Sequence, residues 1–220
     1  MKNKKRIAIC FYGQTRTFDV LNEVHKKLED DNIEFDFFVS TWNDFVDKSQ
    51  FDFCKEKEFI DPNIISFGGN TEREAYLIHR VNLLKSKTEL QESFLYDYIL
   101  WTRSEMWFDR NSLIEFFHKK IERINYEIIT STNIKEHNGK PHLEEDFWFA
   151  GTTEAFDLYS TGWKSFFKIR PRIHSRHGGH TYHAWVIKTQ NLLNHRALQH
   201  DELIWKTQWL KNEEVLIERL

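Results

Sequence analysis

The charged pair Arg103 and Glu105 stands where a buried strand is expected to end. The residues before it, Asp97 to Thr102, form a short apolar run that predicts such a strand. In open α/β folds ligands bind at the carboxyl ends of the strands, so both side chains are expected at that edge. A glutamate oxygen can bind a divalent cation there, and a guanidinium beside it can bind phosphate. The alternative is an ordinary salt bridge at a strand end.

A second candidate site follows the first strand. The continuous apolar run Ile7 to Tyr12 predicts a strand buried on both faces, and the turn Tyr12 to Thr17 follows it. Backbone N–H groups at the start of the next helix favour anions, and Arg16 adds a guanidinium for phosphate. The segment has neither a P-loop nor a G-x-G-x-x-G pattern, so ATPase and dinucleotide chemistry are not indicated. The alternative is a plain strand-to-helix turn that carries a surface arginine.

A third candidate site ends the predicted strand Phe35 to Thr41. Thr41 and Trp42 lead into Asn43 and Asp44, so polar groups flank an indole ring at this point. Such a combination is typical of a nucleoside pocket, because aromatic walls and a few polar groups recur in ligand sites. The alternative is a tryptophan that covers the sheet edge.

Acidic residues precede the short apolar strand predicted for Phe147 to Ala150. A carboxylate held against an apolar surface has a raised pKa and can act as a general base. Asp146 is the candidate because it adjoins the strand, whereas Glu144 and Glu145 are expected in a solvated turn.

A histidine-rich segment runs from His174 to His183. If it is helical, the spacing of three places His177, His180 and His183 on one face, which indicates a metal or phosphate site. A zinc site would need a further ligand and closed geometry, and the segment contains no cysteine that could serve as this ligand. A structural role for the single histidines is the alternative.

The elements that must position these residues alternate between strands and helices. A βαβ opening implies parallel strands with helices on both faces of the sheet, and Ile7 to Tyr12 is predicted to be the central strand. Helices are predicted near Phe18–Glu29, at Glu72–Ser93, from Thr152 or Thr153 through Phe167, and at His180–Leu193, and further strands at Ile64–Phe67, Tyr98–Thr102 and Tyr126–Thr130, with a turn at Asn138–Pro141.

Composition limits the class of protein. With 220 residues, 40% hydrophobic and 30% charged, the chain is expected to be one globular domain. A net charge of −3 without a long basic run gives no indication of nucleic acid as a partner. The two cysteines, Cys10 and Cys54, cannot build a disulfide framework, which favours a reducing, cytoplasmic location. No apolar run is long enough for a membrane span, and the run behind Arg6 is too short for a signal peptide.

The segments in their order resemble a group of bacterial and viral glycosyltransferase-like proteins of the GT-A type. In that group a G-Q-x-R turn, an H-T-W-like strand end, an R-x-D motif and a D-x-F-x-x-G segment recur in sequence. The resemblance spans about residues 6 to 160. It is carried by Tyr12-Gly13-Gln14-Thr15-Arg16, Val39-Ser40-Thr41-Trp42, Arg103-Ser104-Glu105 and Asp146-Phe147-Trp148-Phe149-Ala150-Gly151.

The resemblance implies a single Rossmann-like GT-A domain, of the nucleotide-diphospho-sugar transferase type, over residues 1–220. Residues 6–110 would form the nucleotide-binding part and residues 111–220 the acceptor side. The implied activity moves a sugar from a nucleoside-diphosphate-sugar donor to a hydroxyl acceptor, such as a glycan. The residues expected to contact the nucleotide or its phosphates are Tyr12, Gly13, Gln14, Arg16, Thr41, Trp42 and Arg103.

The resemblance also implies a metal site and a catalytic carboxylate. Glu105, with His180, would hold Mn²⁺ or Mg²⁺ on the diphosphate, and Asp146 would orient or deprotonate the acceptor hydroxyl. The chain differs from the family pattern, because Glu105 replaces an aspartate and Arg103 replaces the first acidic residue. A nucleotide- or glycan-binding protein without catalysis is therefore one alternative. A metal hydrolase built on the histidines is another, although the chain has no H-E-x-x-H pattern.

Overall fold

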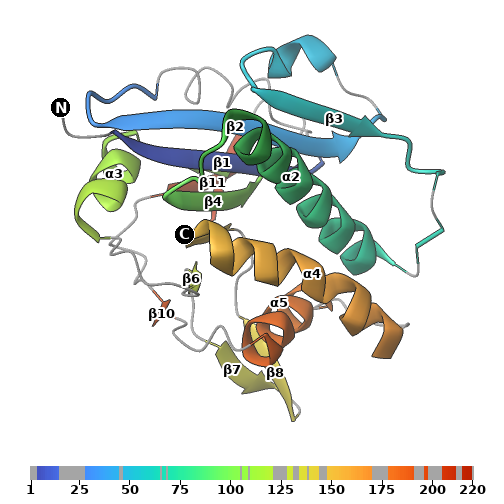
Figure 1. Ribbon diagram of the computed structural model, residues 1–220. Coiled ribbons are helices and arrows are strands. Elements are labelled where there is room, and N and C mark those ends of the chain that lie inside the picture. Colours follow the sequence, from blue (N-terminus) through green and yellow to red (C-terminus); the bar gives the residue numbers. More distant parts are fainter. Residues whose placement is uncertain are drawn as a thin grey trace.

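A seven-stranded sheet organises the protein, as the computed structural model shows in Figure 1. Its strand order is β10-β6-β9-β4-β1-β2-β3, so β1 lies in the interior between β4 and β2. The structure describes residues 4–14, 28–44, 47–64, 66–67, 69–104, 106–108, 110–120, 128–130, 134–137, 139–143, 148–169, 178–190, 196–197, 205–211 and 215–219.

The sheet is mostly parallel. The pairs β1–β2, β1–β4, β2–β3 and β6–β10 are parallel, and β9 alone runs antiparallel, to both β4 and β6. This arrangement confirms the predicted α/β class and the interior position of the first strand. The strands are β1 (Lys5–Gly13), β2 (Ile33–Trp42), β3 (Glu56–Ile60), β4 (Tyr98–Arg103), β6 (Ile128–Thr130), β9 (Trp148–Gly151) and β10 (Arg196–Ala197).

Alternate residues of β1 face opposite layers of the core. Ala8, Cys10 and Tyr12 pack into a cluster with α2 (Asn70–Glu92), α4 (Thr153–Ile169) and α5 (Gly178–Thr189), whereas Ile7, Ile9 and Phe11 pack with α3 (Arg110–Glu115) and the π-helical turn η2 (Phe116–Lys120). Because a strand points successive side chains to opposite faces, a run that is apolar at every position needs cover on both sides. The continuous apolar run of β1 is therefore explained by the two helical layers.

The helices of the first layer are packed against one another. Figure 1 shows α2 and α4 across the same face of the sheet, with α5 beside α4 and the hairpin of β7 (Ile134–His137) and β8 (Lys140–Leu143). Thr152 begins α4 as a cap, since its hydroxyl accepts a hydrogen bond from the N–H of Ala155. Among the described residues, none of the helices is long and apolar enough to cross a membrane.

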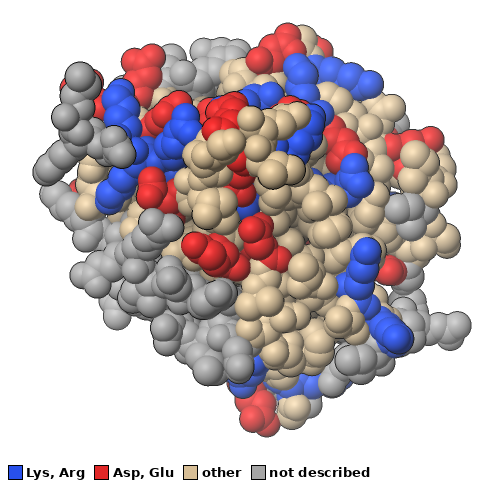
Figure 2. All heavy atoms as spheres, viewed as in Figure 1, with Lys and Arg blue, Asp and Glu red and all other residues tan. Residues whose placement is uncertain are grey.

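Ion pairs connect the edge strand β3 to α2, and Lys55, directly before β3, to β2 and α2. Figure 2 shows basic and acidic side chains mingled over this region. Charged side chains on an edge strand oppose edge-to-edge association, which protects the unpaired side of β3. The pairs are Arg80–Glu58, Lys87–Glu56, Lys55–Asp36 and Lys55–Glu92.

A buried lysine connects α2 to α4. The Lys85 side chain is completely buried, and its Nζ lies 2.9 Å from Glu89 Oε2 and 2.8 Å from Asp157 Oδ1. Glu89 in turn accepts hydrogen bonds from the Thr153 hydroxyl and the N–H of Tyr96. A buried charge is tolerated only when it is paired in this way.

Several predicted elements differ from the observed ones. The prediction of a strand at Ile64–Phe67 was wrong, because β3 (Glu56–Ile60) forms the edge and a turn at Pro62–Asn63 follows it. The predicted helix His180–Leu193 begins earlier, at Gly178, and ends at Thr189. The predicted helix near Phe18–Glu29 lies outside the described residues, apart from positions 28 and 29, which are not helical.

The chain also forms a second, three-stranded sheet that the sequence did not indicate. It has the order β12-β11-β5, and both of its pairs are antiparallel. Its strands are β5 (Met106–Phe108), β11 (Trp205–Lys211) and β12 (Val215–Arg219). The predicted strand Tyr126–Thr130 is present as β6, with residues 126 and 127 outside the described part.

Gly162 allows α4 and α5 to approach closely. A Cβ built at this position would lie 2.8 Å from Val186 Cγ1 and 3.0 Å from Cγ2. We expect Gly162→Ala to lower the free energy of unfolding by about 1 kcal/mol, because overpacking costs more than the gain in helix propensity returns. Urea denaturation of the single and double variants checks this. Val186→Ala should lose less stability in the Gly162→Ala background than in the wild type, and equal losses in both would contradict the clash.

Candidate functional site

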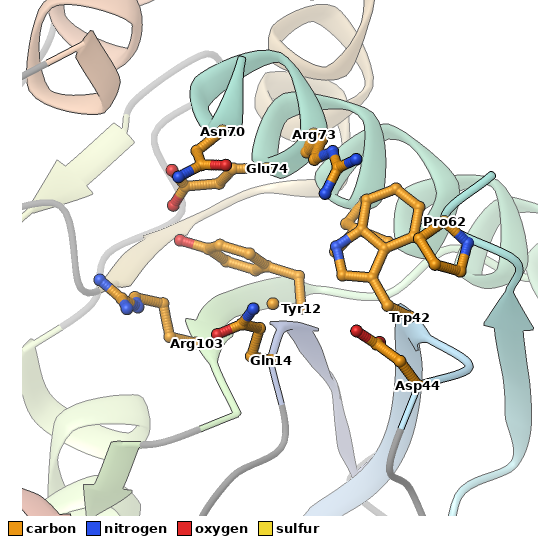
Figure 3. A pocket seen from close by; sticks show the side chains of 11 residues that line it. Tyr12, Gln14, Trp42, Asp44, Pro62, Asn70, Arg73, Glu74 and Arg103 are labelled. Atoms are coloured by element: carbon orange, nitrogen blue, oxygen red, sulfur yellow. The ribbon is translucent and has the colours of Figure 1, made fainter. Parts of the chain in front are cut away.

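A pocket of about 260 Å³ opens at the carboxyl ends of the central strands (Figure 3). The ends of β1, β2 and β4 contribute to it, together with the first turns of α2. Its lining residues are Tyr12, Gly13, Gln14, Trp42, Asp44, Pro62, Asn70, Arg73, Glu74, Leu77 and Arg103.

Parallel register explains why residues distant in sequence meet here. Tyr12 pairs with Arg103 of β4 on one side and with Ser40 of β2 on the other, so the three strands end at one level. Clefts outside the carboxyl ends of strands are the usual ligand sites of open α/β sheets. The position of the pocket follows from the topology of the sheet.

The turn after β1 is held from both sides. The Thr41 hydroxyl donates a hydrogen bond to the carbonyl of Gly13 (2.7 Å), and the Ser104 hydroxyl donates one to the carbonyl of Gln14. Gly13 has a φ of +98°, a region that residues with a side chain rarely adopt. The backbone conformation, rather than lack of space, therefore requires glycine at this turn.

One end of the pocket has an aromatic wall. Trp42 packs against both Phe67 and Tyr76, with ring centroids 5.6 and 6.4 Å away, and the Tyr76 ring is nearly parallel to the indole. The Arg73 guanidinium lies 5.9 Å from the indole centroid. Asp44 and Pro62 line the same end in Figure 3. The indole is only 6% exposed, so a small part of it faces the pocket. An apolar ring flanked by a carboxylate suits a ligand ring that carries hydrogen-bond donors.

The other end of the pocket is charged. Arg103, Gln14 and Glu74 lie around the Tyr12 ring in Figure 3. Burial acts to raise the pKa of Glu74, but the nearby His183 and electrostatic interactions with Arg103 and His180 outweigh it and hold that pKa below its usual value. Glu74 is therefore a carboxylate near neutral pH, opposite a guanidinium that can bind an anion.

The first turn of α2 adds to this charged end. Asn70 begins it and Glu74 directly follows it, whereas Arg73 of the same turn lies at the aromatic end beside Trp42. Among the described residues, no side chain caps the helix at Gly69. A helix start directs backbone N–H groups and a partial positive charge outward, which favours an anionic group of a ligand.

The structure brings together five of the residues predicted to contact a nucleotide. Tyr12, Gly13, Gln14, Trp42 and Arg103 all line the pocket. Thr41 is buried behind it and supports the turn at Gly13 instead of lining the cavity. Arg16, Glu105 and Asp146 lie outside the described residues, so their predicted roles stay predictions.

The two described histidines of the predicted cluster make different contacts. His183 is completely buried and its Nδ1 meets the Tyr159 hydroxyl, whereas His180 places Nδ1 2.7 Å from the carbonyl oxygen of Leu143. Within the described part of the chain, no three His, Cys, Asp or Glu side chains gather into a possible metal site. The metal roles of Glu105 and His180 stay predictions.

Sequence reasoning missed several lining residues. Arg73 and Glu74 were predicted only as part of a helix that begins at Glu72, and Asn70 was assigned to no element, because nothing local shows where a helix start points. Asp44 was noted as one of the polar groups beside Trp42 but was not among the residues expected to contact the nucleotide. The glycines before Asn70 were the one available signal, since such glycines often precede a helix that approaches a ligand.

Comparison with known proteins gives similarity in structure only. No protein-family model and no curated protein sequence matches the chain. A glycosyltransferase involved in the glycosylation of the major capsid of PBCV-1 has a TM-score of 0.48 and 12% identity, over 88% of this chain and 82% of that one. The glycosyltransferase GlyE of Streptococcus pneumoniae TIGR4 has a TM-score of 0.47 and 9% identity, over 90% of this chain and 46% of GlyE.

Proposed function

We propose that the chain is a glycosyltransferase that moves a sugar from a nucleoside-diphosphate donor to a hydroxyl acceptor. One observation carries the proposal. A single pocket at the carboxyl ends of β1, β2 and β4 combines an aromatic wall, an anion-binding end and two carboxylates. A nucleotide-sugar has a flat base, a diphosphate and hydroxyl groups, and these three features match the three parts of the pocket.

The phosphates belong at the charged end. Arg103 supplies a planar guanidinium fork, and the start of α2 supplies oriented N–H groups beside it. The nucleoside belongs at the aromatic end, where its base can pack on Trp42 and Asp44 can accept a hydrogen bond from the base or ribose.

A divalent cation would be held by His180 and Glu105, of which the structure describes only His180. His180, whose Nδ1 lies 2.7 Å from the Leu143 carbonyl oxygen, would be the histidine ligand of the cation. Glu105, two residues after Arg103, would be the carboxylate ligand. The cation would stabilise charge that develops on the leaving phosphate. Asp146 would orient or deprotonate the acceptor hydroxyl.

The direct test is a thermal-shift screen of UDP-, GDP-, CMP- and dTDP-sugars, with and without Mn²⁺. A nucleotide-sugar at a hundred times its Kd should raise the melting temperature by about 5–10 °C, because a ligand that binds only the native state stabilises it. A flat response to every nucleotide-sugar, with and without the metal, would contradict the proposal.

A binding protein without turnover is the second candidate function. It is favoured by Arg103, which stands where the resembling family has an acidic residue. Both candidates predict binding, so turnover separates them. Release of nucleoside diphosphate in the presence of a glycan acceptor supports the transferase, and tight binding without release under all acceptor conditions supports the binding protein.

A further inference from the structure

A buried histidine stands directly behind Glu74. His183 of α5 is completely buried, and its Nε2 lies 3.9 Å from Glu74 Oε1. Its other ring nitrogen, Nδ1, contacts the hydroxyl of Tyr159, which is also buried and belongs to α4. Phe149 and Tyr182 pack beside the imidazole, with ring centroids 4.8 and 5.1 Å away. The ring is therefore fixed in place by its surroundings.

The contacts of His183 favour the neutral tautomer that carries its proton on Nε2. A carboxylate only accepts hydrogen bonds, so the nitrogen that faces Glu74 is the donor. With that proton on Nε2, the Tyr159 hydroxyl donates a hydrogen bond to Nδ1, and His183 stands between Tyr159 and Glu74. Within the described part of the protein, Nε2 has no hydrogen-bond partner. A small movement of Glu74 would satisfy this buried N–H, and leaving it unpaired is costly.

Glu74 faces the pocket on its other side. In Figure 3 its carboxylate lies above the Tyr12 ring, at the end occupied by Arg103 and away from Trp42 and Asp44. A carboxylate repels phosphate, so its partner in a nucleotide-sugar must be a group with O–H donors. The sugar beyond the diphosphate has such groups.

We infer that Glu74 accepts hydrogen bonds from hydroxyl groups of the donor sugar, and that His183, held by Tyr159, is the positioning residue that orients Glu74. This inference rests on the proposed function and names the residue that distinguishes a nucleotide-sugar from the free nucleotide. The alternative is that Glu74 pairs with Arg103 and holds the guanidinium in place. In that case, loss of the Glu74 charge should weaken binding of the free diphosphate and of its sugar conjugate equally.

Calorimetric titration separates the two roles. The probes are UDP and GDP, with UDP-glucose, UDP-galactose and GDP-mannose as their sugar conjugates, and the proteins are wild type, Glu74→Gln and Glu72→Gln. Glu74→Gln should weaken binding of a conjugate roughly tenfold relative to its free diphosphate, because hydrogen bonds to a charged group are lost. Binding of the free diphosphate should stay equal or tighten. Glu72→Gln removes the same charge from the same helical turn without lining the pocket, and should change neither.

The positioning role has its own variants. His183→Phe should lower the preference for the conjugate as Glu74→Gln does, and His183→Gln, which restores an N–H donor, should recover part of it. If His183→Phe does not fold, Tyr159→Phe removes only the hydroxyl of the chain, and it should still reduce the preference. A merely structural role for His183 would lower the melting temperature and leave the preference unchanged.

The titration distinguishes a failure of the inference about Glu74 from a failure of the proposed function. If Glu74→Gln weakens binding of the diphosphate and of the conjugate equally, Glu74 acts by holding Arg103 in place, and the inference is overturned. Unchanged binding of both ligands also overturns it. Wild-type protein that binds no probe of the panel overturns the proposed function, and the inference with it.

Discussion

Replacement of Lys85 by alanine is expected to lower the free energy of unfolding by about 3–5 kcal/mol, because it breaks a buried ion pair from one side. The ammonium group is fully buried between α2 and α4, where it contacts Glu89 and Asp157. Without it, the Glu89 carboxylate stays buried and, within the described part of the chain, keeps the hydrogen bonds from Thr153 and Tyr96. An uncompensated charge in that position costs more than the lost contacts themselves.

Urea denaturation with a matched control measures this effect. Lys87 lies two residues away on the same helix and pairs with Glu56, but its side chain is half exposed. Lys87→Ala should therefore cost less than about 1 kcal/mol. The double variant Lys85→Met with Glu89→Gln removes both charges and should recover part of the loss. Similar decreases in the free energy of unfolding for Lys85→Ala and Lys87→Ala would show that burial does not increase the cost of breaking the Lys85 ion pair.

The parts of the fold that could be predicted are those that depend on local patterns of apolar residues in the sequence. The apolar run of β1 required cover on both faces, and the structure provides it with α2, α4 and α5 on one side and α3 and η2 on the other. The reversed direction of β9 could not be predicted, since a short apolar strand reads alike in either direction.

The error at the sheet edge has a physical cause. The sequence Glu56-Lys57-Glu58-Phe59-Ile60 is charged because it forms an edge, where side chains must face water and pair with α2. Ile64 instead stands after a turn, and it is largely exposed. Hydrophobicity alone therefore selected the wrong segment.

The candidate site was predictable in the same uneven way. Trp42 and Arg103 each follow a strand, and strands of one parallel sheet end at a common edge, so their meeting followed from the pattern. No such rule predicts that Glu74 and His183 meet. Their contact depends on how α2 and α5 pack, which neither helix reveals in its own sequence.

The largest expected effect on binding comes from Arg103. We expect Arg103→Ala to weaken binding of the matching nucleoside diphosphate by about 30- to 100-fold, or roughly 2–3 kcal/mol, because a charge-assisted hydrogen bond is lost. Arg103 also helps to hold the pKa of Glu74 low, so its removal leaves a carboxylate that is easier to protonate and that repels phosphate without a neighbouring positive charge.

Calorimetric titration of UDP and GDP into three variants tests this expectation. Arg103→Lys keeps the charge but loses the planar fork, so it should bind between the wild type and Arg103→Ala. Arg80→Ala is the control, since Arg80 pairs with Glu58 outside the pocket and should leave the affinity unchanged. Raising the ionic strength should weaken wild-type binding more than that of Arg103→Ala, because screening acts on the charge that the variant lacks. Equal affinities of wild type and Arg103→Ala at low salt would remove Arg103 from the phosphate site and leave the start of α2, with Arg73, as the anion-binding group.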